Sequence, residues 1–86
     1  MPEILIYTSN TCPYCTMAKR LLAKKGFSYT ELNLDTDPNL RAEMIQKSQR
    51  RTVPQIYING IHVGGFDDLY GLEQQKKLDD LLACPN

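Results

Sequence analysis

Two cysteines separated by two residues are the part of this sequence best suited to chemistry. They lie in the segment Thr11-Cys12-Pro13-Tyr14-Cys15. A pair at this spacing can cycle between a dithiol and a disulfide, and the thiolate form of a cysteine is the nucleophile in disulfide exchange. The segment therefore predicts a redox site in which Cys12 and Cys15 are the reacting groups.

The roles of the two thiols follow from the helix that the sequence predicts after them. Pro13 is favoured in the first turn of a helix, because its missing N–H would have no intrahelical partner there, and this places Cys12 at the N-cap. Backbone N–H groups directed at the sulfur would stabilise a thiolate, whereas the helix dipole alone contributes only about 0.3–1 kcal/mol. We therefore expect Cys12 to attack and Cys15, one turn inside the helix and less exposed, to resolve.

Two other uses of a closely spaced cysteine pair fit these residues less well. A structural zinc site takes four ligands, and the remaining candidates, His62 and Cys84, stand far apart with no paired spacing. A purely structural disulfide would close too short a loop to constrain much of the unfolded chain. We expect no bound metal, a surface position on a strand for His62, and a peripheral thiol at Cys84.

Length and composition are those of one small globular domain over residues 1–86. Hydrophobic residues make up 42% and charged residues 23%, and ten basic side chains balance ten acidic ones. The balanced charge disfavours nucleic acid or an anionic membrane as a partner, and no apolar run reaches the length of a membrane span. Three cysteines, one of them unpaired, favour a reducing compartment, so we expect a cytoplasmic protein without an export signal.

Hydrophobic periodicity predicts seven elements along the chain. In chain order they are a strand over 4–8, a helix over 13–25, a strand over 27–34, a helix over 38–48, strands over 55–58 and 61–63, and a last helix after 65. Gly26 suits the C′ position of the first helix, and Asp37-Pro38 is typical of the start of the second. Asn59-Gly60 is a strong hairpin signal. The order β-α-β-α-β-β-α predicts an α/β protein with a mixed sheet covered by helices.

The last helix is predicted to extend nearly to the end of the chain. Gly64-Gly65 should break the preceding strand, and Asp67 or Asp68 can cap the helix that follows. Gly71 weakens this helix slightly. Its buried side is assigned to Leu69, Leu72, Leu78, Leu81 and Leu82.

Four motifs in this order make the chain resemble the glutaredoxins of the dithiol type over nearly its whole length. They are Cys12-Pro13-Tyr14-Cys15, Thr52-Val53-Pro54, the Asn59-Gly60 hairpin and Gly64-Gly65-Phe66-Asp67-Asp68. The resemblance implies a thioredoxin-like fold, with a four-stranded mixed sheet flanked by three helices. It also implies a glutathione-dependent oxidoreductase without a tightly bound cofactor. Its implied substrates are glutathionylated proteins and protein disulfides, with ribonucleotide reductase as one expected acceptor, and we expect a monomer.

The same resemblance implies a glutathione site around the two cysteines. Its implied residues are Tyr14, Arg41, Thr52, Val53, Pro54, Gly65, Asp67 and Asp68. Val53-Pro54 resembles the cis-proline turn of the family, in which the backbone of Val53 would pair with the cysteinyl part of glutathione beside Thr52. Without the resemblance a trans bond would be expected, since only about one X-Pro bond in twenty is cis. Tyr14 would line the groove at the thiols.

Charged residues would hold the two ends of the tripeptide, and each also has a simpler interpretation. N–H groups at the start of the last helix, near Gly65, would bind the γ-glutamyl carboxylate, and Asp67 or Asp68 would meet the ammonium group. Both aspartates could instead act only as caps. Arg41 would face the glycine carboxylate or remain a solvated charge. The segment 50–51, which is Arg-Arg, is expected to be a solvated loop.

Some residues depart from the family pattern or bear on alternatives within it. Ser9 stands where many glutaredoxins carry a lysine, whose charge supports the thiolate and the glycine carboxylate. Backbone donors and Arg41 would then have to provide more of this stabilisation. Phe66 occupies a position that is often small, polar or cysteine, which affects the width of the pocket. An iron–sulfur carrier, bridged through Cys12 and glutathione thiols, is disfavoured by the stiffening effect of Pro13. A thioredoxin is disfavoured because the chain has no tryptophan.

Overall fold

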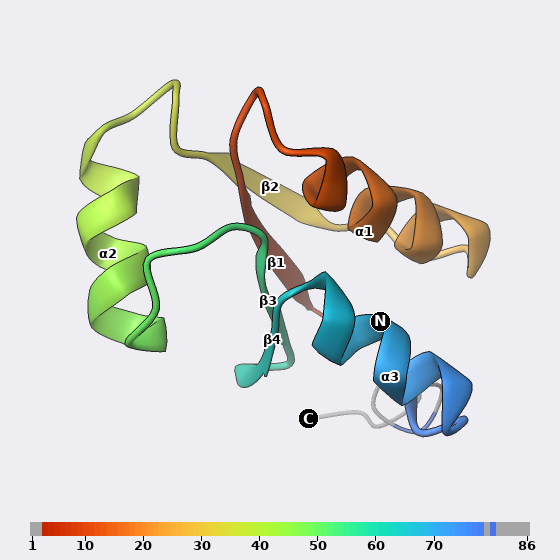
Figure 1. Cartoon of the computed structure of the whole chain (residues 1–86). Coiled ribbons are helices and arrows are strands. Elements are labelled where there is room, and N and C mark those ends of the chain that lie inside the picture. Colours follow the sequence, from red (N-terminus) through yellow and green to blue (C-terminus); the bar gives the residue numbers. More distant parts are fainter. Residues whose placement is uncertain (1–2, 79, 81–86) are drawn as a thin grey trace.

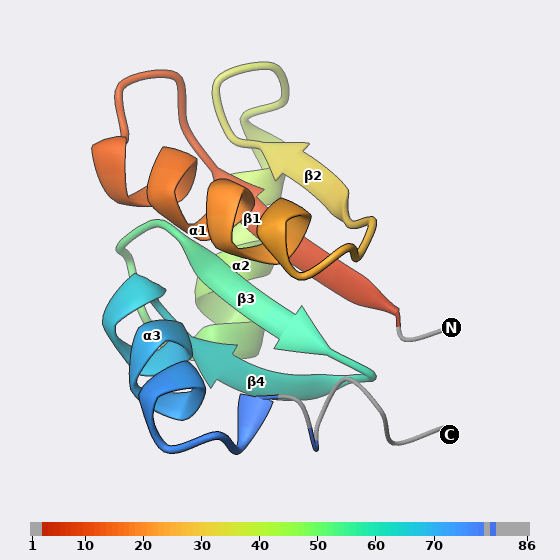
Figure 2. The ribbon, with the colours of Figure 1, turned by 90° about the vertical axis from the view of Figure 1, so that its right-hand side faces the viewer.

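A four-stranded mixed sheet forms the centre of the computed structural model, which describes residues 3–78 and 80. The inner strands are β1 (Ile4–Thr8) and β3 (Gln55–Ile58), and the edge strands are β2 (Thr30–Asn33) and β4 (Ile61–Gly64), in the order β2-β1-β3-β4 (Figure 2). β1 runs parallel to β2 and antiparallel to β3, and β3 is antiparallel to β4. The predicted order of elements and the mixed sheet are confirmed.

Helices cover both faces of this sheet. α1 (Pro13–Lys24) and α3 (Phe66–Gln74) lie on one face, and α2 (Asn39–Ser48) lies on the other (Figure 1). The side chains of the strands alternate between the two sides. The buried cluster toward α1 and α3 contains Ile4, Ile6, Ala18, Leu22, Ile56, Ile58, Leu69 and Leu78. The cluster toward α2 contains Tyr7, Leu34, Met44 and Tyr57.

The helix that carries the cysteines ends as the sequence predicts. Gly26 adopts φ +83°, and its N–H donates to the carbonyl of Ala23 at 2.9 Å. The N–H of Phe27 donates to the carbonyl of Leu22 at 3.1 Å, and Phe27 packs against the same cluster as Leu22. This pair of hydrogen bonds with its apolar contact is a Schellman motif, and it anchors the end of α1 against the core.

The prediction of one long final helix was wrong. α3 begins at Phe66, with Gly65 as its N-cap, and ends at Gln74. Lys76 then adopts φ +61°, and the N–H of Lys77 donates to the carbonyl of Leu72 at 2.8 Å. This turn allows Leu78 to return to the core, where it is fully buried. The predicted core positions 81 and 82 lie outside the described residues.

Smaller differences concern the ends of the strands and of α2. β2 covers only Thr30–Asn33 rather than 27–34, and β4 ends at Gly64, which pairs with Ile56 after a register shift in the ladder. α2 begins at residue 39 with Pro38, not the predicted Asp37, as its N-cap; the carboxylate of Asp37 accepts a hydrogen bond from the N–H of residue 39 at 3.0 Å.

The hairpin between β3 and β4 turns at the predicted dipeptide. Asn59 and Gly60 both have positive φ values, 53° and 83°. Positive values at both central positions are the geometry that favours Asn-Gly in two-residue hairpins. Over the described part of the chain, no helix combines the length and the apolar character needed to span a membrane.

Candidate active site

The two cysteines lie at the first turn of α1, next to the end of β1. Cys12 is the N-cap of the helix, and its sulfur accepts a hydrogen bond from the N–H of Cys15 at 3.1 Å. The two residues form a disulfide. Cys15 is only 1% exposed, whereas Cys12 is half-buried, so the predicted order of exposure is confirmed. Cys12 is therefore the sulfur that a substrate can reach.

The turn before β3 lies directly against the exposed cysteine. The peptide bond between Val53 and Pro54 is cis, as the resemblance implied. The carbonyl oxygen of Val53 lies 3.6 Å from the sulfur of Cys12. Among the described residues the N–H of Val53 has no hydrogen-bond partner. This turn thus offers an unpaired donor beside the reactive sulfur.

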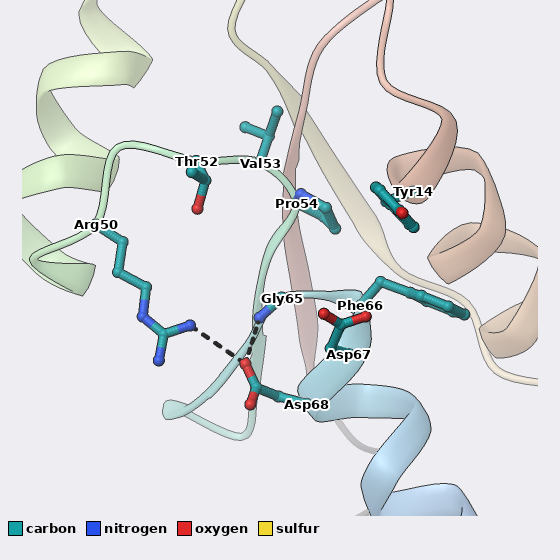
Figure 3. A pocket seen from close by; sticks show the side chains of 9 residues that line it. All are labelled: Tyr14, Arg50, Thr52, Val53, Pro54, Gly65, Phe66, Asp67 and Asp68. Carbon is teal, nitrogen blue, oxygen red and sulfur yellow. Dashed lines mark hydrogen bonds and ion pairs between the residues drawn. The ribbon is translucent and has the colours of Figure 1, made fainter.

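A pocket opens between this turn, the start of α1 and the start of α3 (Figure 3). It is lined by Tyr14, Arg50, Thr52, Val53, Pro54, Gly65, Phe66, Asp67 and Asp68. The structure thus brings together all the residues predicted for the glutathione site except Arg41. Arg41 is exposed on α2 and does not line the pocket.

An ion pair that the sequence did not indicate crosses the pocket. Nη1 of Arg50 lies 3.2 Å from Oδ2 of Asp68, and the same oxygen accepts a hydrogen bond from the N–H of Gly65 at 3.0 Å (Figure 3). Asp68 therefore caps α3 and also binds the loop before β3. Both side chains are about half exposed, 50% and 47%, so the ion pair itself stabilises the fold by only about 0–1 kcal/mol. Asp67 is exposed and, within the described chain, has no ionic partner.

Comparison with known proteins agrees with this geometry. The family model described as Glutaredoxin matches residues 4–63. A glutaredoxin of Pseudomonas aeruginosa is 52% identical over 84 residues, which are 98% of this chain and 100% of the relative. Glutaredoxin 3 of Escherichia coli is 52% identical over 82 residues, covering 95% of this chain and 99% of the relative. The chain belongs to the glutaredoxin family.

Solved glutaredoxin structures share the fold. The solution structure of glutaredoxin from Brucella melitensis has a TM-score of 0.82 and 54% identity, covering 93% of this chain and 87% of that one. The crystal structure of a buckwheat glutaredoxin–glutathione complex has a TM-score of 0.86 and 29% identity, covering 92% and 74%. The fold is thus that of a thioredoxin-like glutaredoxin. The protein is a thiol–disulfide oxidoreductase, and Cys12 and Cys15 are its redox-active pair.

Behind the pocket of this glutaredoxin, a buried polar side chain connects the cis-proline turn to β4. Gln55 is fully buried, and its Nε2 donates to the carbonyl oxygen of Thr52 at 3.0 Å. Its Oε1 must then accept, so Nε2 of His62, 2.7 Å away, carries a proton. The chain of hydrogen bonds from His62 through Gln55 holds Thr52, which borders the pocket.

His62 lies on the edge strand β4, as predicted, but it is more enclosed than a simple surface residue. Its side chain is half-buried, and its ring stacks on Tyr57 with centroids 4.8 Å apart. Burial lowers the pKa of His62, and the nearby charge of Arg50 lowers it further, while Asp68 acts in the opposite direction. His62 thus favours the neutral form, and its hydrogen bond toward the pocket runs through Gln55.

Arg50 and Gln55 are the residues of this glutaredoxin site that sequence reasoning missed. A usable signal existed for Gln55, because it is a polar residue at the start of an otherwise apolar strand, and such residues in a core require a partner. No comparable local signal distinguished Arg50 from Arg51. Ser9 is half-buried at the end of β1 and does not line the pocket, so its effect stays a prediction. In the part of the chain that the structure describes, no three His, Cys, Asp or Glu side chains are grouped as metal ligands.

Proposed function

We propose that this protein reduces glutathione mixed disulfides and protein disulfides, with glutathione as the reductant. The observation that carries the proposal is the pocket beside Cys12, which combines an unpaired peptide N–H with groups of both charges. One of its solved structural relatives is a glutaredoxin–glutathione complex. Glutathione has the complementary groups, because it is a tripeptide with a thiol and a zwitterionic γ-glutamyl end.

The orientation of glutathione follows from the positions of the pocket groups. The backbone of Val53, next to the sulfur of Cys12, would pair with the cysteinyl residue of the tripeptide. The start of α3 would receive the γ-glutamyl end, since the first N–H groups of a helix have no intrahelical partners and favour a carboxylate. Asp67 has no ionic partner among the described residues, so it is better placed than Asp68 to bind the ammonium group.

The reaction uses the two cysteines in sequence. The Cys12 thiolate attacks the glutathione sulfur of a mixed disulfide, a bond forms between these sulfurs, and the protein thiolate leaves with the electron pair and takes a proton. A second glutathione thiolate then attacks the bound glutathione, releasing glutathione disulfide and the Cys12 thiolate. With a protein disulfide, the Cys12 thiolate attacks one of its sulfurs, and the other sulfur leaves as a thiolate and takes a proton. Cys15 then displaces the bound substrate sulfur, so the substrate leaves as a dithiol and the Cys12–Cys15 disulfide seen in the structure forms. Two glutathione molecules reduce this disulfide to the dithiol and leave as glutathione disulfide.

Recognition of the γ-glutamyl end can be tested on the substrate side. We expect the mixed disulfide of glutathione and 2-mercaptoethanol to be turned over with kcat/KM at least about tenfold higher than its cysteinylglycine analogue, because the analogue loses charge-assisted hydrogen bonds. The measurement is a reductase-coupled assay with glutathione for the first substrate and direct product analysis for the second. Equal kcat/KM values would contradict the proposed glutathione site.

The glycine end of glutathione is assigned to Arg41. Arg41 does not line the pocket, so this contact is proposed from the resemblance; the preceding residue Leu40 packs in the same cluster as Val53. We expect Arg41→Ala to raise KM for the glutathione mixed disulfide by roughly five- to thirtyfold with little change in kcat, as for loss of a charged contact. Arg51→Ala is the matched control, since Arg51 is also exposed and outside the pocket. Equal KM values for the two variants would show that Arg41 is only a solvated charge.

A further inference from the structure

A strip of exposed apolar side chains leaves the active site between α1 and α3. Tyr14 is 57% exposed, Met17 45% and Tyr70 46%. Single exposed apolar side chains are ordinary on a protein surface, whereas a continuous apolar strip indicates a contact surface. The question is whether these side chains are connected to one another and to the reactive cysteine.

Phe66 makes that connection. Its ring stacks on Tyr14 with centroids 6.2 Å apart and on Tyr70 with centroids 5.7 Å apart. Phe66 lines the active-site pocket, and Figure 3 shows its ring on the side of Tyr14, opposite Arg50. It also lines a second hollow, here called the α1–α3 groove, together with Met17, Arg20, Leu21, Lys24 and Tyr70. One aromatic row thus runs from the redox site into this groove.

The rim of the α1–α3 groove is positively charged. Arg20 and Lys24 are exposed and lie one turn apart on α1, and neither forms an ion pair with a described residue. Glu73, on the facing helix α3, is paired with Lys25 at 2.8 Å. The two cations of the rim are therefore available for an acidic group of a partner.

We propose that the α1–α3 groove binds the polypeptide part of a protein substrate whose reactive cysteine is flanked by an apolar and an acidic side chain. The apolar side chain would cover Phe66 and Tyr70, and the acidic one would meet Arg20 and Lys24. The proposal rests on the proposed function, in which glutathione occupies the pocket on the other side of Phe66. The two halves of a mixed disulfide then lie on opposite sides of the aromatic row.

The length of the row sets the spacing of the recognised residues. An extended chain advances about 3.3 Å per residue, so the two ring spacings correspond to roughly four residues beyond the reactive cysteine. The apolar and acidic residues should therefore lie within that distance. Substrate preference would arise in binding, while the sulfur exchange at Cys12 would be the same for all substrates.

Synthetic peptides with a single glutathionylated cysteine test this preference. One peptide carries a Phe-Glu pair two residues away on each side of the cysteine, and its partner carries Ser-Lys at the same places. For the wild-type protein we expect kcat/KM about tenfold higher for the Phe-Glu peptide, mainly through KM, as for burial of one aromatic side chain. The same peptides with Ser for Cys, titrated by fluorescence anisotropy, measure binding without any redox step.

Protein variants assign the preference to the groove. Tyr70→Ser should remove most of the preference, and the double substitution Arg20→Glu with Lys24→Glu should reverse its charge dependence. Ile61→Ser is the matched control, because Ile61 is 53% exposed on β4 and does not line the groove. All variants should turn over the mixed disulfide of glutathione and 2-mercaptoethanol within about twofold of wild type, as for ordinary surface substitutions.

The outcomes separate this proposal from the proposed function. Equal kcat/KM values for the two peptides, or a preference unchanged in Tyr70→Ser, would overturn the groove proposal while leaving turnover of the small substrate intact. If the wild-type protein showed no glutathione-dependent turnover but still bound the Phe-Glu peptide preferentially, the proposed function alone would be overturned. A wild-type dimer in sedimentation that Tyr70→Ser dissociates would also overturn the groove proposal, because a second copy would then cover the groove.

Discussion

Cys12→Ser should abolish reduction of both mixed disulfides and protein disulfides, whereas Cys15→Ser should keep deglutathionylation and lose most protein-disulfide reduction. Cys12 is half-buried at the helix N-cap, where the N–H of Cys15 donates to its sulfur at 3.1 Å, so it can react with a substrate as a stabilised thiolate. Cys15 is 1% exposed and can react only with a disulfide already formed on Cys12. A second glutathione can replace Cys15 in the release of a glutathionyl group but not efficiently in the release of a protein.

Steady-state assays with a small glutathione mixed disulfide and with a protein disulfide distinguish these roles. Cys84→Ser is the control for the loss of one thiol, and we expect it to leave turnover of the small substrate unchanged. Position 84 lies outside the described residues, so its peripheral role stays a prediction from the sequence. Equal losses in the Cys12 and Cys15 variants would contradict the assignment of the attacking thiol.

Gly64→Ala should lower the free energy of unfolding by about 2–4 kcal/mol, combining the cost of a non-glycine residue at positive φ with the loss of a helix cap. Gly64 has φ +118°, and a Cβ atom there would overlap the carboxylate of Asp68. Asp68 would have to leave both the N–H of Gly65 and the guanidinium of Arg50. We therefore also expect a higher KM for glutathione substrates, because the start of α3 forms one wall of the pocket.

Chemical denaturation of the reduced proteins measures the change in stability. Gly71→Ala is the matched control, because Gly71 lies inside α3 and a Cβ atom there would meet nothing within 4 Å. This substitution should raise the free energy of unfolding by about 0.5–1 kcal/mol through helix propensity alone. A Gly64→Ala protein as stable as wild type would show that the carboxylate of Asp68 can move away without cost.

Features that depend on neighbouring residues were predictable. The N-cap at Cys12, the C′ glycine at Gly26 and the turn at Asn59-Gly60 each follow from the conformations that a few consecutive residues favour. Hydrophobic periodicity likewise predicted the order of strands and helices along the chain. The end of α3 was missed because it has no such local signal. Lys76 adopts φ +61° there, and a lysine does not indicate a helix stop.

The ion pair between Arg50 and Asp68 shows the opposite case. The two residues are 18 positions apart, and they meet only because α3 packs beside the loop before β3. Gln55 could be recognised as a polar residue in an apolar strand, but its partners at Thr52 and His62 depend on the pairing of β3 with β4. Arg50 and Arg51 are chemically identical neighbours, and the direction of the chain at this turn decides which of them enters the pocket.

The sequence by itself determined the redox pair, the order in which its two thiols are exposed, the arrangement of strands and helices, and the family. These properties rest on residue type and short spacing, which act through local hydrogen bonds and backbone preferences. Only the tertiary structure decided which charges surround the pocket, which of the two aspartates pairs with Arg50, and that Tyr14, Phe66 and Tyr70 form one row. Such contacts join side chains from separate elements, and their geometry depends on how the whole core packs α1 and α3 against the sheet.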